Sequence, residues 1–126
     1  MLAAMAMLQL SRARIVTHEE VTLTSLRHVA KSCHFFLLVN QRYPDGFTEL
    51  STASPPYLTP DFIGTTVEKQ GYVFTYVQGA NGFTLRANPK THGVTGERHF
   101  YTDQSLTIHA TPQNRDADPT IDPVIP

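Results

Sequence analysis

The first 43 residues contain neither glycine nor proline, and this absence limits the fold more than any other feature of the chain. Both residues disrupt helices, so their exclusion from so long a stretch predicts one continuous helix over residues 1–43. We expect it to end near Tyr43, because Pro44 disfavours helical geometry in the residue before it. Apolar residues recur along it at helical spacing and form one stripe: Val16, Leu23, Leu26, Ala30, Cys33 and Leu37.

The remainder of the chain has the composition of a loop followed by an antiparallel sheet. Residues 44–70 are interrupted by prolines and rich in Ser and Thr, which predicts a variable loop. Residues 111–126 contain four prolines and should form an extended tail. We therefore expect a single α+β domain over residues 1–126, with the helix packed on a four-stranded antiparallel β-sheet. Aromatic and β-branched stretches predict the four strands, at residues 71–79, 83–89, 97–102 and 106–110.

Composition narrows the possible functions. A chain of 126 residues fits one domain, and its net charge of −1 gives no support to a nucleic-acid partner. Cys33 is the only cysteine, which excludes an internal disulfide, and its place on the apolar stripe predicts a buried thiol. The sequence carries no motif for acyl transfer, zinc hydrolysis or phosphate binding, so we expect no catalytic residues.

The opening run MLAAMAML, residues 1–8, is apolar without interruption. It is too short to span a bilayer, which takes about 20 apolar residues, and no Lys or Arg precedes it as in a secretory signal. On the expected fold the sheet covers only the later part of the helix, so the first fifteen residues would lack a packing partner in the chain. Exposed apolar surface of this kind usually marks contact with a partner or a membrane.

Several segments resemble the type IV pilin and type II secretion pseudopilin family. LAAMAMLQLSRARI is similar to ILAAIAIPNLLRSRI, which follows the membrane-inserted part of pilin helices. SLRHVAKSCHFFLLVNQRYPDGF is similar to SLRTINTAEVTYSSTYPDGF. The most specific block, GVTGERHFYTDQS, is similar to GVTGTRHFFTDQSG. The matched segments span roughly residues 2–110.

The chain departs from the family pattern at three places. It lacks the GFTLIELLIVVAIIG segment, which carries the family's peptidase cleavage site and membrane anchor. Leu8 replaces a proline, so the helix should run straight where family helices bend. Leu106 replaces the glycine of the DQSG turn, where a positive φ favours glycine. The last hairpin should therefore either bear a steric cost or use a different turn.

The resemblance implies a structural subunit of a type IV pilus-like or pseudopilus filament, without a cofactor. The apolar helix would pack along the filament axis and the sheet would face outward. Its partners would be copies of itself, other pilins, or a separate helical peptide that supplies the missing membrane half. The subunit would act in an extracellular filament, at the cell surface or in the periplasm. If a full-length form exists that carries the membrane half, it would be anchored in the inner membrane before assembly. The predicted assembly contacts are Met1, Leu2, Met5, Leu8 and Ile15.

The alternative is a soluble periplasmic binding or accessory module that is derived from a pilin and no longer polymerises. Changing Met5 or Leu8 to an acid discriminates between the two hypotheses. Loss of assembly with an intact sheet domain would support the filament, whereas improved solubility alone would favour the module.

The six histidines and the acidic residues offer weaker chemical hypotheses. His99 and His109 would face each other across the last hairpin if residues 103–105 formed its loop, but two ligands do not make a metal site. Glu19 and Glu20 are interpreted as surface charges, because adjacent helical residues point in different directions. The helix histidines lack the spacing of zinc ligands: His18, His28 and His34. A calcium site in the tail remains an alternative, although the tail aspartates match no EF-hand loop: Asp116, Asp118 and Asp122.

Overall fold

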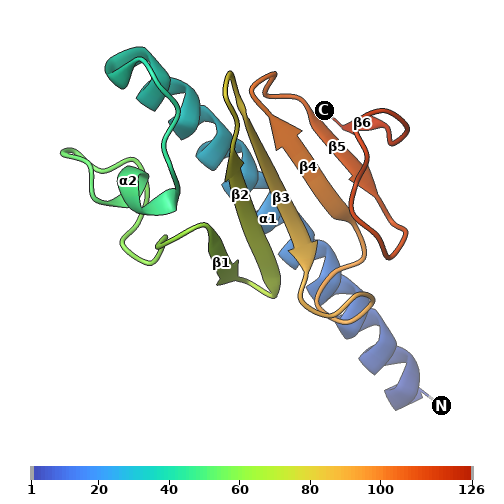
Figure 1. The fold of residues 1–126 in the computed structure, drawn as a ribbon. Coiled ribbons are helices and arrows are strands. Elements are labelled where there is room, and N and C mark those ends of the chain that lie inside the picture. Colours follow the sequence, from blue (N-terminus) through green and yellow to red (C-terminus); the bar gives the residue numbers. More distant parts are fainter. Residues whose placement is uncertain (1, 126) are drawn as a thin grey trace.

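The structure, a computed structural model, describes residues 2–125, with side chains described from Arg12 onward. Its first element is one unbroken helix, α1 (Leu2–Asn40), as the missing Gly and Pro predict (Figure 1). The helix ends three residues earlier than expected. Gln41 adopts a φ of 60°, and its N–H donates to Leu37 O at 2.7 Å, which closes the last turn before Pro44 is reached.

A six-stranded antiparallel sheet packs against α1, and its strands lie in chain order (Figure 1). The α+β class is therefore confirmed, and the expected number of four strands is wrong. The two additional strands, β1 and β6, form the edges of the sheet. The strands are β1 (Thr66–Lys69), β2 (Tyr72–Gln78), β3 (Phe83–Pro89), β4 (His99–Asp103), β5 (Ile108–Thr111) and β6 (Val124–Ile125).

β1 lies inside the segment that was predicted to be a loop. Gln70 and Gly71 have φ values of 55° and 77°, and they join Lys69 to its partner Tyr72. Positive φ at both central residues is the geometry of a two-residue type I′ hairpin. A Gln-Gly pair is a weaker hairpin signal than Asn-Gly, so local pattern did not reveal this strand. The same segment also contains a short helix, α2 (Phe47–Ser51), which buries Phe47 and Leu50.

The last hairpin has a different register from the predicted one. Its tip ends at Leu106, whose φ is 63° and whose N–H donates to Asp103 O at 2.9 Å. His109 therefore pairs with Tyr101, and His99 pairs with Thr111, so the predicted His99–His109 pair is wrong. Leu106 occupies the left-handed position that favours glycine, and the turn keeps this geometry in spite of the side chain.

The core lies between α1 and one face of the sheet. Leu26 and Val29 are buried there with sheet residues that include Phe74. Cys33 is fully buried, as its place on the stripe predicts, and burial raises the pKa of its thiol to about 12. Val16 is 51% exposed, so the predicted stripe does not extend that far. Within residues 2–125, none of the helices combines the length and the hydropathy that a membrane span would need.

The C-terminal tail folds back over the other face of the sheet and is not a free extended segment. Ala117 is only 1% exposed, and its carbonyl accepts a hydrogen bond from Arg86 Nη1 at 2.7 Å. Arg115 forms a bidentate pair with Asp122, at 2.8 and 2.7 Å, which closes the tail into a loop before β6. Charge-assisted hydrogen bonds thus fix a segment whose prolines exclude a long strand.

Candidate assembly surface

Residues 2–17 of α1, called the overhang below, run beyond the end of the sheet (Figure 1). They correspond to about 24 Å of helix at a rise of about 1.5 Å per residue. From Arg12 to Thr17 every side chain is exposed except that of Ile15, which is half-buried. The sheet therefore leaves uncovered the helical segment that carries the apolar run.

Most of the predicted assembly residues lie in this overhang. Leu2, Met5 and Leu8 are part of its helical backbone, but their side chains lie outside the described part of the structure, as does Met1 altogether. Ile15 is half-buried at the inner end of the overhang. The helix is continuous through Leu8, where the family pattern has a proline.

A polar clamp ties α1 to the sheet where the overhang begins. Glu19 is 7% exposed. Its Oε1 accepts the backbone N–H groups of Glu97 and Arg98 at 3.0 and 2.9 Å, and its Oε2 accepts Arg98 Nε at 3.0 Å. The neighbouring His18 donates from Nδ1 to Thr95 O at 3.2 Å. The interpretation of Glu19 as a surface charge is wrong: three donors offset the desolvation of its carboxylate.

Residues 90–98, called the clamp loop, receive Glu19 and pack closely against the sheet. Tyr72 Oη donates to Arg98 O at 2.8 Å. The same hydroxyl passes Gly96, where an added Cβ would come within 2.3 Å of it. The GVTGERHF block therefore uses Gly96 to bring the backbone against Tyr72, and the next two residues to bind the helix.

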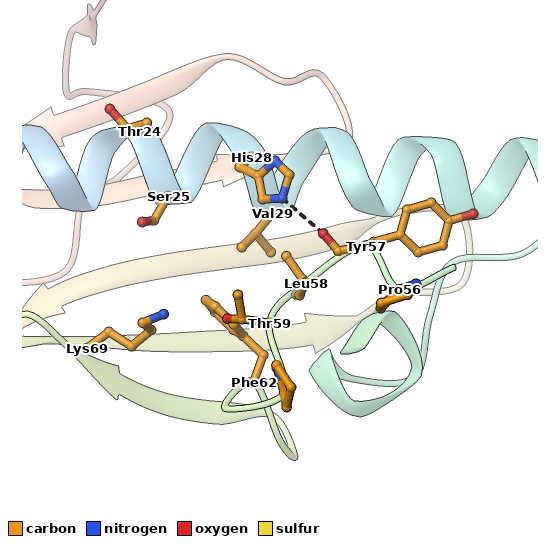
Figure 2. A pocket seen from close by; sticks show the side chains of 11 residues that line it. Thr24, Ser25, His28, Val29, Pro56, Tyr57, Leu58, Thr59, Phe62 and Lys69 are labelled. Atoms are coloured by element: carbon orange, nitrogen blue, oxygen red, sulfur yellow. Dashed lines mark hydrogen bonds between the residues drawn. The ribbon is translucent and has the colours of Figure 1, made fainter. Parts of the chain in front are cut away.

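An open groove lies farther along α1, between the helix and the loop that follows α2 (Figure 2). Its volume is about 620 Å³. Val29, Leu58 and Phe62 line it, and His28 Nε2 donates across it to Tyr57 O at 3.0 Å. Figure 2 shows that this bond holds the loop beside the helix. The groove is thus a surface made by segments far apart in the sequence.

One ion pair borders the groove. Lys69 Nζ lies 2.8 Å from Asp61 Oδ2 and 4.7 Å from the ring centre of Phe62. Hydrogen bonds from Lys69 and Thr59 lower the pKa of Asp61 to about 2, so its carboxylate is charged at neutral pH. Because the ammonium group is already paired, the groove offers mainly apolar atoms to a ligand.

The acidic and basic candidates for a metal site do not converge. Among the side chains described, no three His, Cys, Asp or Glu residues form a cluster that could hold a metal ion. His28 is held at Tyr57, whereas the His34 ring lies 6.1 Å from that of Phe35. The tail aspartates are bound to separate partners: Asp116 to Asn88, Asp118 to Thr120, and Asp122 to Arg115.

Sequence reasoning also missed a contact between two histidines. His92 Nδ1 lies 3.1 Å from His99 Nε2, and His109 instead donates from Nδ1 to Asp122 O at 2.9 Å. The two histidines are seven residues apart, but His92 lies on the clamp loop and His99 on β4, so they do not share one helix or strand. Only the fold of the clamp loop brings them together.

Comparison with known proteins finds no relative. No protein-family model, no curated protein and no solved structure matches this chain. The functional argument therefore rests on the residues and the geometry described above.

Proposed function

We propose that this chain is a structural subunit of a filament of the pilin or pseudopilin kind. Copies join through the apolar part of α1, and the sheet with its connecting loops forms the outer surface of the filament. The subunit acts outside the cytoplasm, at the cell surface or in the periplasm. It makes and breaks no covalent bond.

The overhang is the observation that carries this proposal. Its first seven residues, LAAMAML at 2–8, are all apolar, and the helix that carries them extends past the sheet (Figure 1). Burial of one Leu or Met side chain contributes about 1.5–3 kcal/mol. The overhang and the covered part of α1 form one continuous helix, so this segment cannot fold back onto its own sheet without breaking the helix. Its burial therefore requires a surface outside its own sheet domain, and in a filament another copy supplies that surface.

The shape of the subunit favours an open assembly over a closed dimer. The overhang and the part of α1 that the sheet covers are different segments of one helix (Figure 1). A contact between unlike surfaces of two copies leaves one of each free, and repetition of it generates a ring or a helical filament. The sequence resemblance to pilins, most specific in GVTGERHFYTDQS, favours the helical filament.

The substitution Leu8→Glu tests the proposal. It places a charge at the last residue of the apolar run without touching the core described above. We expect loss of filaments by electron microscopy and sedimentation, with an unchanged circular dichroism spectrum and melting temperature. Lys31→Glu is the matched control, because Lys31 is exposed on the covered part of the same helix. This variant should assemble as the wild type does.

Two results would contradict the filament. The first is wild-type protein that never sediments above the size of a monomer or dimer. The second is equal assembly of Leu8→Glu and wild type.

The groove beside Val29 and Leu58 favours the second candidate function, a soluble binding module, because an open apolar cavity can accept a small ligand. In that case Leu8→Glu would improve solubility and leave binding of an apolar probe at the groove unchanged.

A further inference from the structure

The clamp loop is fixed at a second point, on the face of the sheet that the tail covers. His92 of the clamp loop and His99 of β4 share one nitrogen–nitrogen hydrogen bond of 3.1 Å. Their ring planes are inclined by 29°, with ring centres 5.3 Å apart. His99 is buried, whereas His92 is half-buried. One proton between two imidazoles thus joins the loop to the sheet.

The neighbours determine which nitrogen of His99 carries a proton. The carboxylate of Asp116 only accepts, so the Asn88 amide nitrogen faces it, at 3.0 Å. This orientation turns Asn88 Oδ1 toward His99 Nδ1, also at 3.0 Å. His99 Nδ1 must therefore donate, and Nε2 of the neutral ring is an acceptor. His92 Nδ1 is consequently the donor of the bond between the two histidines.

The pair accepts one additional proton without losing this bond, but not two. His92 Nε2 takes no part in the bond, so a proton there would leave the N–H···N bond intact. A second proton on His99 Nε2 would set one N–H against another and place a positive charge on each ring. Burial and the charge of His92 lower the pKa of His99; among the tail charges that face it, Asp116 raises this pKa and Arg115 lowers it. On β5 its partner is Thr111, which does not titrate.

We propose that the His92–His99 pair is an acid-sensitive latch, which holds the clamp loop closed at neutral pH and releases it when both rings are protonated. The same loop supplies the N–H groups that bind Glu19. Its release therefore loosens the anchor of α1 at the base of the overhang. The latch is a property of the folded subunit and does not depend on whether the chain polymerises.

The direction of the pH effect follows from the lowered pKa of His99. As pH falls below about 6.5, the unfolded chain takes up a proton on this residue before the folded chain does. Acid therefore favours opening. The latch contributes its full stabilisation at neutral pH. This stabilisation is lost as the pH falls from about 6.5, the ordinary pKa of a histidine, through the lower pKa of His99 in the folded state.

Amide hydrogen exchange of residues 93–98, corrected for the intrinsic rate, tests the latch between about pH 7.5 and about pH 5. We expect protection of these amides in the wild type to fall about tenfold at the lower pH. Each pH unit between the ordinary pKa of His99 in the open state and its lower pKa in the closed state raises the opening equilibrium constant by about that factor. His92→Gln should abolish the fall, since a glutamine amide can donate to His99 Nε2 but does not titrate. His34→Gln, a half-buried histidine of α1 outside the pair, should keep it.

Unchanged wild-type protection at the lower pH would overturn the proposal, as would a fall that survives in His92→Gln. NMR titration of the wild-type rings gives a second readout that needs no variant. A coupled titration, in which His99 takes up its proton after His92, supports the latch. Independent titration of both rings at the ordinary histidine pKa contradicts it.

Discussion

The two parts of α1 belong to one helix but are stabilised by different forces. From His18 onward the helix is fixed to the sheet, first by the Glu19 clamp and then by apolar residues such as Leu26 and Cys33. From Leu2 to Thr17 it extends past the sheet, and all but one of its described side chains are exposed. The difference indicates which part holds the subunit together and which is free to bind another chain.

Composition differs between the two parts in the same way. The overhang is rich in Ala, Leu, Met and Arg, which are strong helix formers, so local preference alone favours a helix there. The covered part contains many β-branched residues, among them Val21, Thr22, Thr24 and Val29, which are weaker helix formers. Its helical form depends more on packing against the sheet. Substitutions in the covered part should therefore affect stability, and those in the overhang should affect assembly.

The substitution Leu26→Ala should produce the largest effect, because Leu26 is fully buried in the core of the covered part. Removing its side chain leaves a cavity and should lower the free energy of unfolding by about 3 kcal/mol. Val16→Ala makes a similar truncation at the inner end of the overhang, where the side chain is 51% exposed. It should change the free energy of unfolding by less than about 0.5 kcal/mol. Urea denaturation measures both. Similar losses in the two variants would mean that the overhang packs on its own sheet.

The substitution Glu19→Gln tests the boundary between the two parts. The carboxylate accepts three hydrogen bonds, and an uncharged amide would weaken all of them and leave Arg98 Nε facing a poorer acceptor. We expect a loss of about 2 kcal/mol in urea denaturation. Glu20→Gln is the control: Glu20 is exposed, 3.6 Å from Arg98 Nη2, and its substitution should change stability by less than about 0.5 kcal/mol. Equal effects at the two positions would exclude a special role for the buried carboxylate.

These positions also show what the sequence could and could not predict. The long helix and strands β2 to β5 follow local rules, namely the missing breakers and the runs of aromatic and β-branched residues. The edge strand β1 was missed because it depends on its pairing with β2 across Gln70-Gly71. Glu19 was misread because its donors are nearly 80 residues away in the chain. The candidate latch was missed for a different reason: His92 lies in an irregular loop, whose path to His99 no local pattern predicts.

The substitution Leu106→Gly should produce the smallest effect, and in the opposite direction. Leu106 has a φ of 63°, a conformation that costs a side-chain-bearing residue about 1–2 kcal/mol. Glycine relieves this strain but loses more backbone freedom on folding, so we expect a net gain of about 0.5 kcal/mol in urea denaturation. Thr107→Gly, at a neighbouring position without positive φ, should instead reduce stability by about 0.5–1 kcal/mol. Leu106 borders a small cavity with Ala30 of the covered part of α1. A loss of stability in Leu106→Gly would therefore show that its side chain supports the helix, and that the last hairpin also helps to hold the covered part of α1.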